Sequence, residues 1–230
     1  MNKKPLFHIG INYPRLYKYT KAEFADKLIN EGEFRIGTMY EYRLATAKEI
    51  GDPHEGTKGY SFLGTPEEQR RNIDAFVRSR PDLSRNHNAS ELGQALADNI
   101  PIGFVEHCPD QYLYCTTYTF DEAVMRDFEY DACIEIINPR FFAESLSEAM
   151  RPYAPYGVMR ECVYTNRWVD WAQQNDLHAD VIKPLQLQHQ KEVRLIWSSA
   201  REVFLGADLN PLEHKFVKSM QAARYCRRLI

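Results

Sequence analysis

The triplet Gln190–Lys191–Glu192 carries two side chains, Gln190 and Glu192, of types that take part in chemistry. A carboxylate held beside a substrate stabilises positive charge that develops in a transition state, and an amide orients a substrate by hydrogen bonds. The segment 193–197 that follows alternates in hydrophobicity, which predicts a strand. The triplet therefore stands at the mouth of a strand, where a sheet edge presents side chains to a ligand.

The alternation also predicts how this strand faces. Val193, Leu195 and Trp197 fall on one face, which we expect to pack in the core. Glu192 and Arg194 then point the other way. They are either a solvent-facing ion pair or the floor of a pocket, and the sequence leaves both interpretations open.

Two further patches contain groups that suit ligand binding. Lys18 and Tyr19 end a predicted early strand, directly before a predicted helix. Thr116 and Thr117 place hydroxyl groups on a predicted middle strand at 112–119, a segment with high β-propensity. Lysine, tyrosine and threonine are also ordinary strand residues. Only their positions in space decide whether they form one ligand site or lie on separate surfaces.

A basic group on an early strand, hydroxyls on a middle strand and a Gln/Glu-x-Glu triplet on a late strand resemble the order in ADP-ribosyltransferase folds. The resemblance implies NAD as the substrate, with Lys18 orienting a phosphate or ribose. It implies that Thr116 or Thr117 supports the pocket, that Glu192 stabilises an oxocarbenium-like transition state, and that Gln190 helps to select the acceptor. The acceptor, protein or nucleic acid, stays open.

Short motifs also resemble a bacterial domain family of unknown function. The matching residues are Leu16–Tyr19, Asp52–Pro53 with Glu55, and Lys191–Glu192 with Arg194. The resemblance implies an accessory protein of mobile or defence loci, with a toxin or effector role as an extension and a partner protein as a further expectation.

This second resemblance implies that Lys18, Asp52 and Glu192 belong to one site. The chain departs from the family by having Gly51 where asparagine is usual and His54 where an aromatic residue is usual. A structural alternative exists for Asp52, because Asp-Pro forms turns and aspartate caps the backbone that follows.

The segment 38–64 is rich in Gly, Asp, Pro and Tyr and is predicted to be a long loop, a feature that is often functional. It supplies Tyr40, Tyr42 and Tyr60 as candidates for stacking on a nicotinamide ring. Tyr19, Tyr40 and Asp52, with the two threonines, form the predicted NAD-binding set.

Composition bounds the alternatives. The formal net charge of −3 argues against a general nucleic-acid or anionic-membrane binder. Five cysteines without a C-x-x-C spacing, and seven histidines without an H-x-H or H-E-x-x-H pattern, predict no disulfide scaffold and no metal. Cys115 remains a weaker candidate nucleophile. With no apolar run long enough for a signal peptide or membrane helix, we expect a cytoplasmic protein.

Element signals predict a single α+β domain, with a mixed, mainly antiparallel sheet and peripheral helices. Residues 1–14 are expected to be an irregular arm, and residues 65–100 a helical insertion. Thr20 and Glu23 form a predicted capping box, and Gly32 a helix stop. The predicted strands are 15–19, 34–37, 112–119, 132–137, 157–164, 181–187 and 192–198, with an edge strand at 203–205. The predicted helices are 21–32, 66–80, 91–99, 121–128, 139–150 and 211–228, with a single helical turn at 168–174.

Two rival functions remain open from the sequence. One is a non-enzymatic module that senses a nucleotide or a partner protein through the same aromatic segment. The other is a nucleic-acid-acting protein, for which the predicted terminal helix 211–228 offers a basic surface, although such charges commonly form a solvated helix face. The cations concerned are Lys215, Lys218, Arg224, Arg227 and Arg228.

Overall fold

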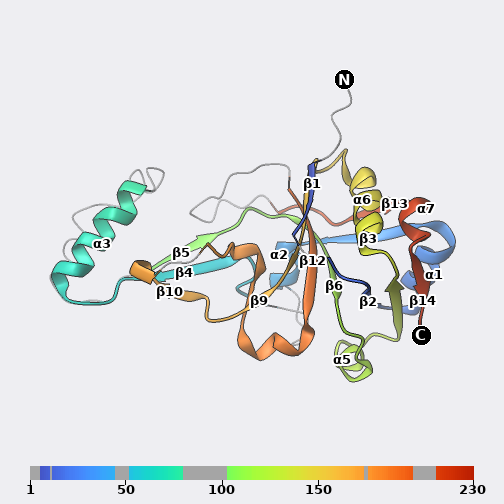
Figure 1. Ribbon diagram of the computed structural model, residues 1–230, viewed down its shortest axis with the longest axis horizontal. Helices are drawn as coiled ribbons and strands as arrows, with labels where there is room; N and C mark the ends of the chain where they lie inside the picture. The colour runs from blue at the N-terminus through green and yellow to red at the C-terminus, as the bar shows by residue number, and fades with distance from the viewer. Residues whose placement is uncertain (1–5, 11, 45–51, 80–102, 174–175, 199–210) are drawn as a thin grey trace.

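The computed structural model describes residues 6–10, 12–44, 52–79, 103–173, 176–198 and 211–230 (Figure 1). Its main feature is a nine-stranded sheet in which only the β1–β8 pair is parallel. The predicted α+β class with a mainly antiparallel sheet is confirmed. The sheet order is β1 (Leu6–Ile9), β8 (Tyr156–Glu161), β12 (Glu192–Ser198), β6 (Tyr112–Thr117), β2 (Leu16–Thr20), β7 (Ala132–Ile136) and β14 (Cys226–Arg228), with β3 (Glu33–Thr38) and β13 (Lys215–Lys218) on a side branch.

The side branch makes a fork at β6. One edge of β6 pairs with β12 along its whole length, from Tyr112 to Thr117. The other edge pairs with β3 only at Tyr112 and Leu113, and with β2 only at Thr117. Strands β2 and β3 therefore diverge from the two ends of β6, and the sheet opens between them beside residues 114–116.

One face of the sheet carries the main core. Val193, Leu195 and Trp197 of β12 are fully buried there, as their alternation predicts, and the Trp197 indole donates a 2.8 Å hydrogen bond to Ser147 Oγ. The helices that cover this core are α1 (Ala22–Glu31), α6 (Pro139–Met150) and α7 (Met220–Ala223). A fourth short helix, α5 (Glu122–Asp127), packs against Tyr19 and Cys133 from the opposite face.

Helix ends follow the local sequence in part. Asn138 caps α6 and Pro139 is its first residue, and Gly32 ends α1 in the left-handed conformation at φ 64°. The predicted capping box at Thr20 is wrong. The cap position is Lys21, and the amide of Ala22 is satisfied by Asp131 at 2.7 Å, so a distant side chain replaces the local cap.

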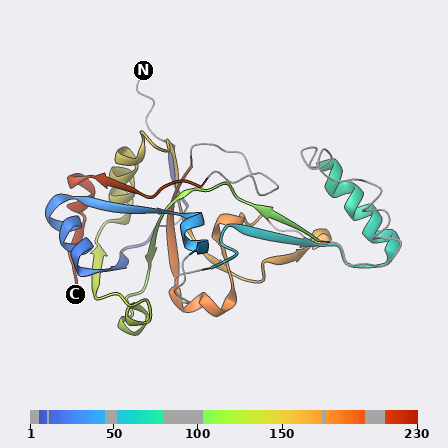
Figure 2. The same ribbon diagram turned by 180° about the vertical axis from the view of Figure 1, so that it is seen from behind.

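A smaller three-stranded sheet forms an arm that extends away from the main sheet (Figure 1 and Figure 2). Its strands are β10 (Trp168–Asp170), β4 (Thr57–Ser61) and β5 (Gly103–His107). The helix α3 (Pro66–Ser79) packs on one face through Ile73 and Phe76, in an aromatic cluster separate from the main core. The first predicted helix of the 65–100 segment thus forms, while residues 80–102 lie outside the described part.

Several sequence predictions are corrected by tertiary pairing. The expected arm 1–14 contains β1, and the expected loop 38–64 contains α2 (Met39–Leu44) and β4. Segment 168–174 begins as β10 before one 3₁₀ turn. Segment 181–187 is two 3₁₀ turns around β11 (Ile182–Lys183), which pairs with β9 (Val163–Tyr164). The predicted edge 203–205 lies outside the described residues.

The predicted terminal helix 211–228 is also wrong. Residues 215–218 pair with β3 as β13, only Met220–Ala223 are helical, and the chain ends as β14 against β7. Sheet pairing outweighs the helix propensity of this segment. Of the helices that the structure describes, none has the length and apolar character to cross a membrane.

Candidate functional site

A pocket opens beside β6 at the fork from which β2 and β3 diverge, and we call it the fork pocket. Its cavity of about 80 Å³ is closed by β12 and by side chains from the segments at 42, 55, 128–130 and 183–190. Seven of the residues that the sequence predicts for an NAD site line it together: Lys18, Tyr19, Tyr42, Thr116, Thr117, Gln190 and Glu192.

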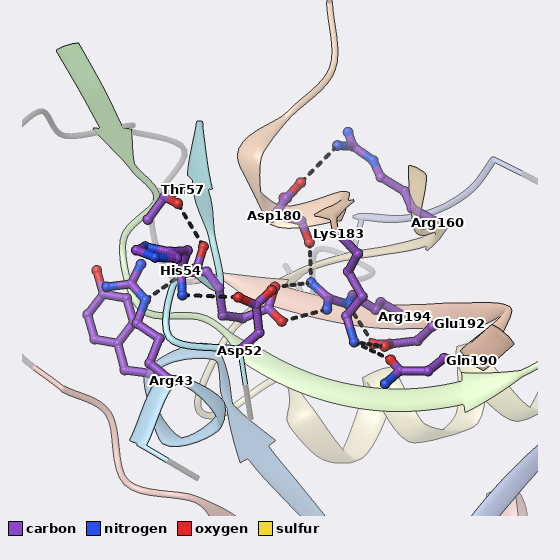
Figure 3. A network of polar contacts seen from close by, with 12 residues as sticks. Arg43, Asp52, His54, Thr57, Arg160, Asp180, Lys183, Gln190, Glu192 and Arg194 are labelled. Atoms are coloured by element: carbon purple, nitrogen blue, oxygen red, sulfur yellow. Dashed lines mark hydrogen bonds and ion pairs between the residues drawn. The ribbon is translucent and has the colours of Figure 1, made fainter. Parts of the chain in front are cut away.

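Glu192 lies on the floor of the fork pocket between two cations. One carboxylate oxygen accepts a 2.7 Å hydrogen bond from Arg194 Nε, and the other is ion-paired with Lys183 (Figure 3). Burial alone raises the pKa of Glu192, but the charges of Arg194 and Lys183 outweigh burial and hold that pKa well below its usual range. Glu192 is therefore ionised throughout the neutral range.

Arg194 links this floor to a distant segment. Its guanidinium donates to both carboxylate oxygens of Glu55, at 2.7 and 2.9 Å, and to the carbonyl of Asp180 at 2.6 Å. Arg194 is 1% exposed. Of the two orientations open from the sequence, the pocket floor is therefore the one that forms, and Arg194 and Glu192 are not a solvent-facing pair.

A backbone turn at Lys191 aims both members of the Gln-x-Glu triplet inward. Lys191 adopts the left-handed conformation at φ 45° and ends a 3₁₀ helix, Leu185–Gln190, directly before β12. The side-chain oxygen Oε1 of Gln190 accepts a 2.7 Å hydrogen bond from Lys183 Nζ, beside the Lys183–Glu192 ion pair (Figure 3). Lys183 thus positions both predicted side chains.

Lys18 enters the pocket from the opposite wall, and its ammonium group lies 5.0 Å from the centre of the Tyr114 ring. Within the described part of the chain, no carboxylate lies at ion-pair distance from it. Burial lowers the pKa of Lys18, because the charged form loses solvation. No described carboxylate is its partner, so an anionic ligand would stabilise the charged form of Lys18.

The charges that line the pocket do not cancel. Lys18, Lys183 and Arg194 are cationic, whereas Glu55 and Glu192 are anionic. Because Glu55 and Glu192 are already bound to Arg194 and Lys183, the unmatched positive charge resides at Lys18. The pocket favours a ligand that carries negative charge near this lysine.

A second cavity of about 380 Å³ adjoins the first and lies between β2, β3 and α1. The two cavities share four lining residues: Lys18, Tyr19, Tyr42 and Tyr130. Lys18 therefore stands where the cavities meet, and a ligand with two aromatic halves joined by an anionic group matches this layout.

Two predicted residues lie elsewhere. Tyr40 does not line either cavity, and its hydroxyl donates a 2.6 Å hydrogen bond to the Cys108 carbonyl. Asp52 is ion-paired with Arg167 and accepts a 3.0 Å hydrogen bond from the amide of His54. Asp52 does not line the fork pocket with Lys18 and Glu192, because the Asp-Pro turn uses Asp52 as its cap.

Other residues of the pocket were missed or given no role. Glu55 and Arg194 belong to the motifs of the family resemblance, which implies no catalytic or binding role for them. Lys183 and Tyr130 had no sequence signal, because lysine beside a proline and tyrosine after a helix are common on surfaces. Tyr42 lines the pocket, whereas Tyr60 belongs to the aromatic cluster of the arm.

Cys115 also lines the pocket, but its chemistry does not suit a nucleophile. Burial raises the pKa of the Cys115 thiol to about 12, and the charge of Glu192 adds to this effect. The thiol is protonated at neutral pH, and thiolate is the reactive form.

The chain matches no protein-family model, no curated protein and no solved structure. Its functional assignment therefore depends on the geometry of the fork pocket.

Proposed function

We propose that the protein is an NAD-using ADP-ribosyltransferase-like enzyme whose active site is the fork pocket. One observation carries the proposal: Lys18, the two threonines Thr116 and Thr117, and Glu192 come from three separate strands and line the same cavity. Had they faced different surfaces, the proposal would have no support.

The reaction breaks the bond between the ribose C1′ and the nicotinamide nitrogen. The electron pair of that bond leaves with nicotinamide, and positive charge develops at C1′. Glu192, which is ionised at neutral pH, stabilises this charge and accepts a hydrogen bond from a ribose hydroxyl. A nucleophile, either an acceptor group or water, then bonds to C1′ and loses its proton to solvent. Glu192 cannot act as a general acid here, because its proton is absent.

Lys18 has a separate role in binding. It stands between the two cavities, at the place that suits the pyrophosphate of a dinucleotide. Nicotinamide ribose would occupy the fork pocket beside Glu192, and the adenosine half the larger cavity, which contains the Phe24 and Tyr42 rings. Gln190 lies beside Glu192, where it would contact the acceptor.

The test is release of nicotinamide from NAD by the purified protein, with water, protein extracts and nucleic acid supplied as acceptors. Glu192→Gln should lower the rate by about 100-fold or more, since it removes a charge that acts in the transition state. Glu148→Gln, an exposed change in α6, is the control and should leave the rate unchanged. A wild-type protein that releases no nicotinamide with any acceptor would show that the proposal is wrong.

A second candidate is a nucleotide-binding module without turnover. The observation that favours it is that Arg194 and Lys183 already bind both oxygens of Glu192. These two cations reduce the negative electrostatic potential that Glu192 exerts on a substrate. This candidate predicts that NAD raises the melting temperature according to RT ln(1 + [L]/Kd) without release of nicotinamide.

The nucleic-acid alternative has less support. Its basic terminal helix does not form, and Arg227 and Arg228 are ion-paired with Glu135 and Asp26. A role as a toxin or defence effector, and a dedicated partner protein, stay predictions from the family resemblance.

A further inference from the structure

The second face of the small sheet in the arm carries an aromatic platform. Trp168 of β10 lies across two glycines, Gly59 in the adjacent strand β4 and Gly103 in β5, the strand beyond it. A Cβ atom at Gly59 would come within 2.5 Å of the indole ring, and one at Gly103 within 2.7 Å. The two glycines therefore let the indole lie close against the sheet.

The outward side of this indole is available to a ligand. Trp168 is 48% exposed, whereas the other two tryptophans are packed, Trp197 in the main core and Trp171 in the aromatic cluster of the arm. Trp168 also lines a cavity of about 510 Å³, which we call the platform cavity. A large aromatic ring held against a glycine floor, with its other side facing a cavity, suits stacking by a flat ring.

The walls of the platform cavity carry polar groups but little net charge. Its two ionised residues, Asp52 and Arg167, neutralise each other in a buried ion pair. Amide side chains are present at Asn166 and Gln186. The side-chain oxygen of Asn166 accepts a 3.0 Å hydrogen bond from the backbone amide of Trp168. An amide presents donors and acceptors side by side, which matches the edge of a nucleobase.

The platform cavity and the fork pocket share two chain segments. Asp52, His54 and Thr57 line the platform cavity, while Glu55 between them reaches into the fork pocket. In the same way Pro184 lines the platform cavity and Lys183 the fork pocket. The two sites therefore lie on opposite sides of the same two segments.

We propose that the platform cavity binds a nucleobase, which stacks on Trp168 and is read at its edge by Asn166 and Gln186. Every base has a flat π-face, so stacking on an aromatic side chain stabilises binding of any of them. If the proposed transferase function holds, this base belongs to the acceptor, and this assignment rests on the proposed function. Binding of the base in the platform cavity does not depend on the proposed function.

The experiment is a calorimetric titration of the full chain with adenosine, guanosine, cytidine and uridine, with tryptophan fluorescence as a second readout. We expect saturable binding of at least one nucleoside, with quenching of the Trp168 emission. Trp168→Ala should weaken binding by about tenfold or more, as loss of one stacking contact requires. Trp168→Phe, which keeps a smaller ring, should give an intermediate loss and guards against misfolding of the alanine variant.

Two further variants test the assignment to this site. Gly59→Ala should weaken nucleoside binding, because the added methyl group displaces the indole without removing it. Glu148→Gln, an exposed change in α6, should leave nucleoside binding unchanged, since Glu148 does not line the platform cavity. The inference is overturned if no nucleoside binds, if binding survives Trp168→Ala unchanged, or if glucose and N-acetylglucosamine bind and nucleosides do not. None of these readouts requires NAD, so they stand apart from any failure of nicotinamide release.

Discussion

Arg194 and Glu55 are 139 positions apart in the chain and form a bidentate ion pair in which both side chains are almost completely buried. This pair joins β12 of the main sheet to the segment that leads into β4 of the arm. It also fixes Arg194, which in turn holds Glu192. The stability of the protein and the shape of the fork pocket therefore depend on the same guanidinium group.

Removal of one partner of this pair should be costly. Glu55→Gln leaves the Arg194 charge buried with one carboxylate instead of two, and we expect the free energy of unfolding to fall by about 3 kcal/mol or more. Urea denaturation followed by circular dichroism measures the change. Glu144→Gln, which breaks the exposed Arg140–Glu144 pair, is the matched control and should change stability by less than about 0.5 kcal/mol. Equal effects of the two substitutions would contradict a structural role for the buried pair.

Acid should weaken the same network. The pKa values of Glu55 and Glu192 are lowered in the folded protein, because the charges of Arg194 and Lys183 outweigh the effect of burial. Their stabilising contribution is complete above the unfolded pKa of about 4.3 and is lost as the pH falls below it. Between pH 5 and pH 3 the free energy of unfolding should fall less steeply in Glu55→Gln than in the wild type. Parallel curves would show that these carboxylates are not linked to folding.

The main sheet was largely accessible to sequence reasoning because its strands carry local signals. Val193, Leu195 and Trp197 alternate, and one such face can be buried in only one register. Asn138-Pro139 and Gly32 mark helix ends through their own backbone chemistry. Where the outcome depended on distant partners, the predictions failed, as for β13 and β14, whose sequence alone favours a helix.

The candidate site was predicted in part for the same reason. Lys18, Thr116 and Glu192 sit on strands that the sequence predicts, and the resemblance to ADP-ribosyltransferase folds implies that these strands meet at one site. The partners of Glu192 cannot be inferred in this way. Lys183 reaches the site from an irregular segment and Glu55 from a turn, and no periodicity fixes where such side chains point.

The thiol of Cys115 should be chemically inert although it lines the pocket. Burial raises its pKa to about 12, so the reactive thiolate is scarce near pH 7. Cys115→Ser should retain nicotinamide release within about twofold of wild type, since the change replaces one small group by another. Loss of all turnover in a variant with unchanged thermal stability would instead assign a catalytic part to the sulfur. Mass spectrometry after brief iodoacetamide treatment at pH 7 should likewise find Cys115 unmodified.

Lys18 should make ligand affinity depend on pH. Burial lowers its pKa below the ordinary value of about 10.4, and only its charged form attracts an anionic ligand. The affinity for NAD or ADP should therefore be highest below the Lys18 pKa and should fall as the pH rises through it.

Two substitutions test this assignment. Lys18→Met should weaken ADP binding by about tenfold or more at pH 7, because the unmatched charge at the junction of the two cavities is removed. Lys18→Arg should keep much of the affinity but lose the fall at alkaline pH, since a guanidinium stays charged there. Calorimetric titrations with ADP in steps from pH 6 to pH 11 measure both effects. A wild-type affinity that stays constant over this range, or an equal pH dependence in Lys18→Arg, would show that another group controls anion binding.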